Sequence, residues 1–134
     1  MKVLGLDHIG IAVENIDQAV RLYEKTLGVQ ADEIFTAGSG AMRGSFISLG
    51  GTARLELAQP LSPASPAARF VAEKGYGLTH LAIRVADLDK AIEELKSLGF
   101  QFLDEKPTPS SSGGRVIFVA PKSFGGVALE LVGK

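Results

Sequence analysis

The chain has 134 residues, 46% of them hydrophobic, which is typical of one globular domain with its own core. The 14 Lys and Arg residues and the 15 Asp and Glu residues give a net charge of -1, so no basic surplus favours nucleic acid or an anionic membrane as a partner. The absence of cysteine excludes disulfides and a thiol nucleophile. We see no signal-peptide pattern and no run of membrane-spanning length, and we expect a cytoplasmic location.

The first half of the chain predicts a strand, a helix and three more strands. Residues 3–13 alternate as a strand does, and a helix is expected over residues 16–27. Asn15 suits the N-cap of this helix and Gly28 suits the residue that follows it. A weak strand is expected within residues 30–40, and two further strands are expected at 42–49 and 52–58.

The prolines and serines of residues 60–66 have the composition of a linker, and a short helix is expected at 67–74. The second half then repeats the first. A strand from residue 78 leads to Asp87, an N-cap candidate, and to a helix that ends at Gly99. The remaining predicted segments are strands at 100–103, 115–119 and 127–132 and a loop at 107–114.

The spacing of matching residues indicates an internal duplication. His8 and His80 lie 72 positions apart, as do Asp17 and Asp89. This repeat predicts one α+β domain over residues 1–134, made of two tandem βαβββ modules. The modules cover about 3–60 and about 78–134, with the linker and short helix at 61–77. We expect them to form a curled mixed sheet around a metal-binding cleft.

Four chemically useful side chains occupy equivalent positions in the two modules. Each faces away from the branched apolar residues of its own strand. They are His8, Glu56, His80 and Glu130. One histidine or glutamate on a strand is more often a structural or surface residue, but four at matching positions favour a metal site. Two imidazoles and two carboxylates suit divalent cobalt, nickel, zinc or manganese.

Two cationic residues near the last predicted hairpin are weaker candidates. Arg115 and Lys122 flank this hairpin and could bind an anionic group of a substrate. The alternative is that both are solvated surface charges.

Four stretches of the chain, residues 6–13, 60–66, 75–80 and 121–131, together resemble the vicinal oxygen chelate superfamily of glyoxalase, bleomycin-resistance and dioxygenase proteins. Within it, the chain is most similar to the methylmalonyl-CoA epimerases. The resemblance implies an isomerase that binds one divalent metal ion, with cobalt favoured, that acts on an acyl-CoA and that forms a homodimer. It also implies that Glu56 fills a ligand position and that Glu130 is both ligand and catalytic base.

The chain departs from the pattern of this family at three places. Thr79 and Ala120 stand where many members have a histidine, and residues 42–48 contain no acid, although some members have a second catalytic acid there. The resemblance therefore leaves the second acid or base unidentified.

The reaction implied is removal of the α-proton of methylmalonyl-CoA through a metal-stabilised enolate, followed by return of a proton to the opposite face. A lactoylglutathione lyase of the glyoxalase I type, or another metal-dependent isomerase, remains an alternative. A ring-cleaving dioxygenase is less favoured, because both histidines are assigned to the metal. A metal-free protein that binds a small ligand on the same scaffold is the alternative outside the enzymes.

Overall fold

The computed structural model describes residues 1–110 and 113–134. These residues form two compact units. The central unit is His8–Thr79, and the terminal unit combines Met1–Asp7 with His80–Lys134. The fold class is α+β, and each half of the sequence forms the βαβββ series that the duplication predicts.

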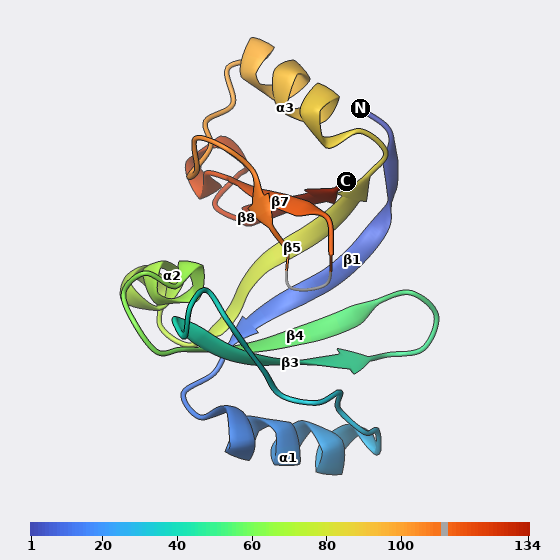
Figure 1. Ribbon diagram of the computed structural model, residues 1–134, viewed down its shortest axis with the longest axis vertical. Coiled ribbons are helices and arrows are strands. Elements are labelled where there is room, and N and C mark those ends of the chain that lie inside the picture. Colours follow the sequence, from blue (N-terminus) through green and yellow to red (C-terminus); the bar gives the residue numbers. More distant parts are fainter. Residues whose placement is uncertain (111–112) are drawn as a thin grey trace. The chain divides into compact units, whose positions relative to one another are not determined.

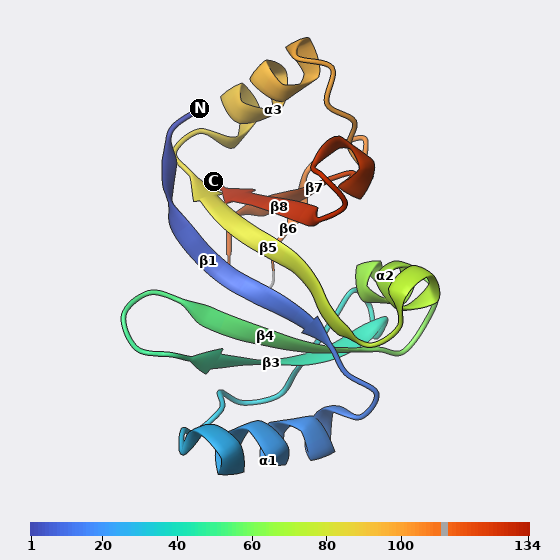
Figure 2. The same ribbon diagram turned by 180° about the vertical axis from the view of Figure 1, so that it is seen from behind.

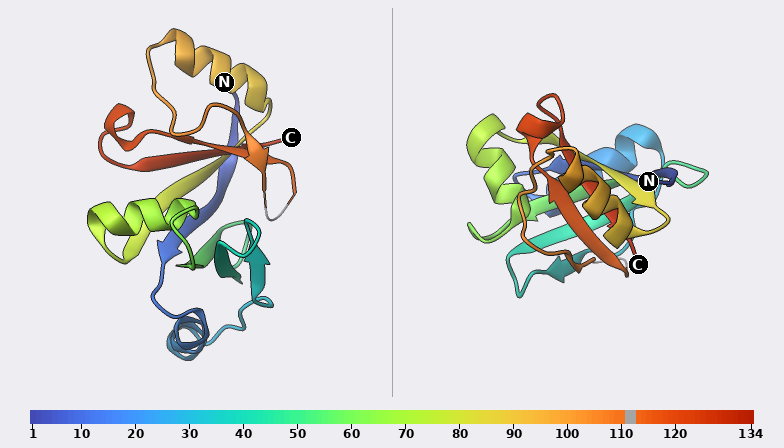
Figure 3. Two further views of the ribbon diagram at one scale, coloured as in Figure 1. Left: turned by 60° about the vertical axis from the view of Figure 1, so that its left-hand side comes forward. Right: turned by 90° about the horizontal axis from the view of Figure 1, so that it is seen from above.

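The central unit contains a mixed sheet with the strand order β2-β3-β4-β1. In it β1 pairs in parallel with β4, whereas the β2–β3 and β3–β4 pairs are antiparallel. Helix α1 lies alongside β3 and β4 (Figures 1 and 3). The elements are β1 (Val3–Ala12), α1 (Ile16–Leu27), β2 (Phe35–Ala37), β3 (Met42–Ser48), β4 (Arg54–Pro60) and α2 (Pro66–Lys74).

Helix α1 begins and ends at the predicted residues. The Asn15 side chain accepts a hydrogen bond from the Gln18 N–H at 3.0 Å, and Gly28 has φ 67°, the left-handed conformation that glycine adopts without strain. The helix covers a core centred on the fully buried side chains of Ile16, Ile47 and Leu57. The face of the central sheet that α1 covers is therefore its apolar face.

The terminal unit repeats this plan with the strand order β5-β8-β7-β6. Strands β5 and β8 are parallel, and β7 pairs with its neighbours in the antiparallel sense. Helix α3 contacts β8, and Figure 2 shows these elements from behind. The elements are β5 (Gly77–Val85), α3 (Leu88–Ser97), β6 (Thr108–Pro109), β7 (Arg115–Val119), the 3-10 helix η1 (Pro121–Ser123) and β8 (Ala128–Gly133).

The core of the terminal unit matches the core of the central unit. Leu88 from α3 is fully buried against Ile117 of β7 and Leu131 of β8. The Asp87 side chain accepts a hydrogen bond from the Lys90 N–H at 3.1 Å, so Asp87 caps α3 as predicted. The first residues of the chain belong to this unit, and Lys2 accepts a hydrogen bond from the Ala86 N–H at 3.0 Å.

The structure differs from the sequence prediction in the segment before β7. The strand predicted at 100–103 is reduced to one bridge between Phe102 and Val119. The Asp104 carboxylate accepts a hydrogen bond from the Phe118 N–H at 3.3 Å. In a longer strand pairing this N–H would bond to a main-chain carbonyl, so the side chain of Asp104 takes the place of the ladder here. Within the loop predicted at 107–114, β6 pairs with β7, and residues 111–112 lie outside the described residues.

None of the helices in the described ranges is long and apolar enough to span a bilayer.

Truncation of Leu57 tests the core of the central unit. Leu57→Ala removes a fully buried side chain and leaves a cavity, so we expect the free energy of unfolding to fall by about 2–5 kcal/mol. The control is Leu22→Ala on the outer face of α1, where the side chain is 60% exposed and the expected change is within about 0.5 kcal/mol. Urea denaturation of both variants measures the difference. Equal losses of unfolding free energy in the two variants would contradict the burial of Leu57 in this core.

Candidate metal centre

The register of the parallel strands places one histidine and one glutamate on the same face of each sheet. In the central unit His8 is the partner of Arg54, and Gly10 is the partner of Glu56. Because side chains alternate along a strand, His8 and Glu56 share one face, opposite to the face on which Leu57 enters the core.

The terminal unit has the same register. His80 is the partner of Ala128, and Ala82 is the partner of Glu130. His80 and Glu130 therefore lie on one face, while Leu131 packs under α3 on the other. The sequence prediction that each of these side chains faces away from its apolar neighbours is confirmed within each unit.

The two His–Glu pairs have nearly the same geometry. His8 Nε2 lies 3.8 Å from Glu56 Oε1, and His80 Nε2 lies 4.0 Å from Glu130 Oε1. Both distances are too long for a hydrogen bond. Two ligand atoms at about 2.1 Å from one metal ion lie about 3.0 to 4.2 Å apart, depending on the angle at the metal. The donors and spacing of each pair therefore fit coordination of a divalent ion.

A phenylalanine stands beside each histidine. The His8 and Phe46 rings meet edge to face, with centroids 5.6 Å apart, and His80 meets Phe118 in the same way at 5.2 Å. His8 and His80 are 4% and 9% exposed. Packing thus restricts the orientation of each imidazole and limits its access to water.

Strand β3 offers no carboxylate on the face that carries Glu56. Its register with β4 places Gly44 and Phe46 on this face. A Cβ atom at Gly44 would lie 2.8 Å from Phe35 Cζ and 3.0 Å from the Leu57 carbonyl oxygen, so a larger side chain would not fit without rearrangement. A second acid or base must therefore come from another element.

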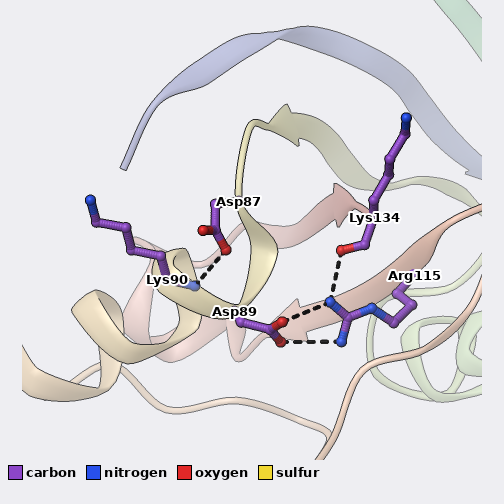
Figure 4. A network of polar contacts seen from close by, with 5 residues as sticks. All are labelled: Asp87, Asp89, Lys90, Arg115 and Lys134. Carbon is purple, nitrogen blue, oxygen red and sulfur yellow. Dashed lines mark hydrogen bonds and ion pairs between the residues drawn. The ribbon is translucent and has the colours of Figure 1, made fainter.

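The structure gives Arg115 a pairing that the sequence did not predict. Its guanidinium donates two hydrogen bonds to the Asp89 carboxylate, at 3.1 and 3.0 Å, and one to the Lys134 carbonyl at 2.7 Å (Figure 4). The hydrogen bond from Arg115 lowers the pKa of Asp89 against the opposing effect of desolvation. In the central unit Arg43 and Asp17 form the corresponding pair at 3.3 Å.

This repeated ion pair connects the first turn of each helix to a neighbouring strand. The role of Arg115 in substrate binding stays a prediction, and so does that of Lys122, which is exposed in η1. Sequence reasoning missed Phe46 and Phe118. Their spacing of 72 positions, which equals that of the two histidines, was the signal that could have identified them.

Comparison with known proteins agrees with this architecture. Residues 7–118 match the Glyoxalase/Bleomycin resistance protein/Dioxygenase superfamily. The mitochondrial methylmalonyl-CoA epimerase of Homo sapiens is 35% identical over 127 residues, which are 94% of this chain and 72% of that protein.

Solved structures give the same result. The methylmalonyl-CoA epimerase of Mycobacterium tuberculosis has a TM-score of 0.87 and 35% identity, covering 98% of this chain and 88% of its own. A variant of the Streptomyces coelicolor methylmalonyl-CoA epimerase, in complex with 2-nitronate-propionyl-CoA, has a TM-score of 0.87 and 30% identity over 99% of both chains. The chain belongs to the glyoxalase/bleomycin resistance protein/dioxygenase superfamily and, within it, to the methylmalonyl-CoA epimerase family.

The Asp89–Arg115 pair predicts a stability difference that depends on pH. The lowered pKa of Asp89 in the folded protein means that its carboxylate stabilises the fold above the pKa of the unfolded chain, and that this contribution is lost as pH falls through the folded pKa. We therefore expect Asp89→Asn to lower the urea midpoint at neutral pH but to match wild type in strong acid. The exposed Glu105→Gln variant serves as the control. If Asp89→Asn lowered the urea midpoint by the same amount in strong acid as at neutral pH, the stabilising role of the Asp89 carboxylate would be contradicted.

Proposed function

We propose that His8, Glu56, His80 and Glu130 bind one divalent transition metal ion. The proposal rests on two His–Glu pairs at equivalent registers, each with a spacing that fits a metal and each with a buried histidine. Imidazole and carboxylate donors suit cobalt, nickel, zinc and manganese, and we propose cobalt as the physiological ion.

The proposed activity is epimerisation of methylmalonyl-CoA. Relatives named methylmalonyl-CoA epimerase span most of this chain, and the Streptomyces coelicolor variant binds an acyl-CoA analogue. The observation that carries the proposal is Glu130, a 7% exposed carboxylate on the same face as a histidine in a chain of this family.

Glu130 is proposed to take the α-proton. A carboxylate that binds a metal ion through one oxygen keeps its second oxygen available as a base. A divalent ion held by His8, Glu56, His80 and Glu130 would supply positive charge beside the acyl group, which would favour loss of the α-proton. Return of a proton on the opposite face requires a second group. Because β3 has no acid there, we propose Glu56, the counterpart of Glu130 in the duplication, for this role.

A lactoylglutathione lyase of the glyoxalase I type is the second candidate, because the same four ligands would serve it. The test compares exchange of the α-proton of methylmalonyl-CoA for deuterium with turnover of the methylglyoxal–glutathione adduct on one metal-loaded preparation. Exchange without adduct turnover is the expected result. The opposite result would overturn the epimerase assignment. A protein that binds no metal and catalyses neither reaction would be a metal-free binding protein.

The cytoplasmic location and the homodimer remain proposals that rest on the family. Sedimentation of the purified protein tests the dimer, and a monomer at micromolar concentration would contradict it.

Substitution of Glu130 separates its role as a base from its role as a ligand. Glu130→Gln keeps an oxygen donor of similar size but removes most of its basicity. We expect the variant to retain substantial metal while α-proton exchange falls by roughly 100-fold or more. Metal content and exchange are measured on the same preparation, with metal restored in excess if the content falls. Glu105→Gln, on an exposed segment, is the matched control. Near-normal exchange with metal bound would show that Glu130 is a ligand only.

A further inference from the structure

Two aromatic rings of the central unit lie against each other beside His8. Phe35 of β2 and Phe46 of β3 have nearly parallel rings, with an interplanar angle of 19° and centroids 5.6 Å apart. Phe35 is the register partner of Gly44, and a Cβ atom at Gly44 would lie 2.8 Å from Phe35 Cζ. The Phe35 ring therefore occupies the space that a side chain at Gly44 would need, and from there it reaches the Phe46 ring.

Arg54 of β4 approaches the Phe46 ring from the other side. Its Cζ atom lies 4.0 Å from the centre of the ring, where the ring quadrupole and dispersion stabilise a guanidinium. Because β2 and β4 are the two neighbours of β3 in the sheet, Phe35 and Arg54 hold the Phe46 ring between them. Phe46 is also 7% exposed, so its ring has little room to change rotamer.

The Phe46 ring held in this way meets the imidazole of His8. The interplanar angle of the two rings is 75°, and His8 Nε2 lies 3.8 Å from Glu56 Oε1. Half a turn of the imidazole about its Cβ–Cγ bond would place the carbon Cε1 where Nε2 lies, and a carbon atom is no metal ligand. The orientation of this ring therefore decides whether a ligand atom faces Glu56.

We propose that Arg54 is a positioning residue for His8 and that it acts through the Phe46 ring. Arg54 and Phe35 hold this ring in place, and its contact with the imidazole keeps Nε2 directed toward Glu56. The inference rests on the proposed function, because the purpose of this orientation is to present Nε2 to a metal ion.

The test measures the order of the imidazole rings in metal-free protein, by NMR relaxation of ¹³C-labelled histidine. The chain contains two histidines, so every sample reports on both rings. In wild type we expect order parameters of about 0.85 for both, as in a rigid backbone. For Arg54→Gln we expect the His8 ring to fall below about 0.6, the flexible range, and the His80 ring to keep its value. His80 is the internal control, because its register partner is Ala128 and not an arginine.

Variants of Phe46 show whether Arg54 acts through this ring. Phe46→Leu should lower the order of the His8 ring, and adding Arg54→Gln should lower it no further, because the two residues act as one unit. Phe46→Tyr keeps the aromatic ring and should retain the order of wild type. We also expect Phe46→Leu to weaken Co²⁺ binding by roughly 10- to 100-fold, the usual cost of losing a residue that orients a ligand.

Arg43→Gln is the matched control, because Arg43 lies in β3 of the same sheet but pairs with Asp17 of α1. We expect its His8 ring to be as ordered as in wild type. Three results of Arg54→Gln would overturn the role of Arg54: no change at His8, an equal loss of order at both histidines, or a further loss when it is added to Phe46→Leu. A wild-type protein that binds no Co²⁺ would instead overturn the proposed metal site, which the measurements on metal-free protein do not presuppose.

Discussion

The register of the two parallel strand pairs is the constraint on which the candidate site depends. Pairing of Gly10 with Glu56 and of Ala82 with Glu130 fixes the face that each glutamate occupies. A shift by one residue would turn a carboxylate into a core that a helix covers. Burial of the leucines beside each glutamate opposes such a shift, so the packing that stabilises each sheet also orients its ligands.

The duplication supplies two copies of this arrangement together with its supports. In each copy a phenylalanine limits the orientation of the histidine, and an arginine ties a strand to the first turn of the helix. These supports do not themselves need to contact a substrate.

Local signals were sufficient to predict much of the fold. Asn15 and Asp87 mark the starts of two helices because a side-chain cap acts within three residues of itself. Strand alternation was sufficient to place the four candidate ligands on faces. Contacts between distant segments were not predictable in this way. The pairing of Arg115 with Asp89 and the position of Arg54 over Phe46 depend on which strands become neighbours, and alternation within one strand does not contain that information.

Metal titration can show whether the two His–Glu pairs jointly bind one metal ion, as we propose. Chelator-treated wild-type protein should bind one equivalent of Co²⁺ per chain. His8→Ala and His80→Ala should each weaken that binding by more than the roughly 10- to 100-fold cost of losing a group that merely supports a ligand. If either variant still binds one equivalent with wild-type affinity, that histidine is not a ligand and the account of a shared metal centre is wrong.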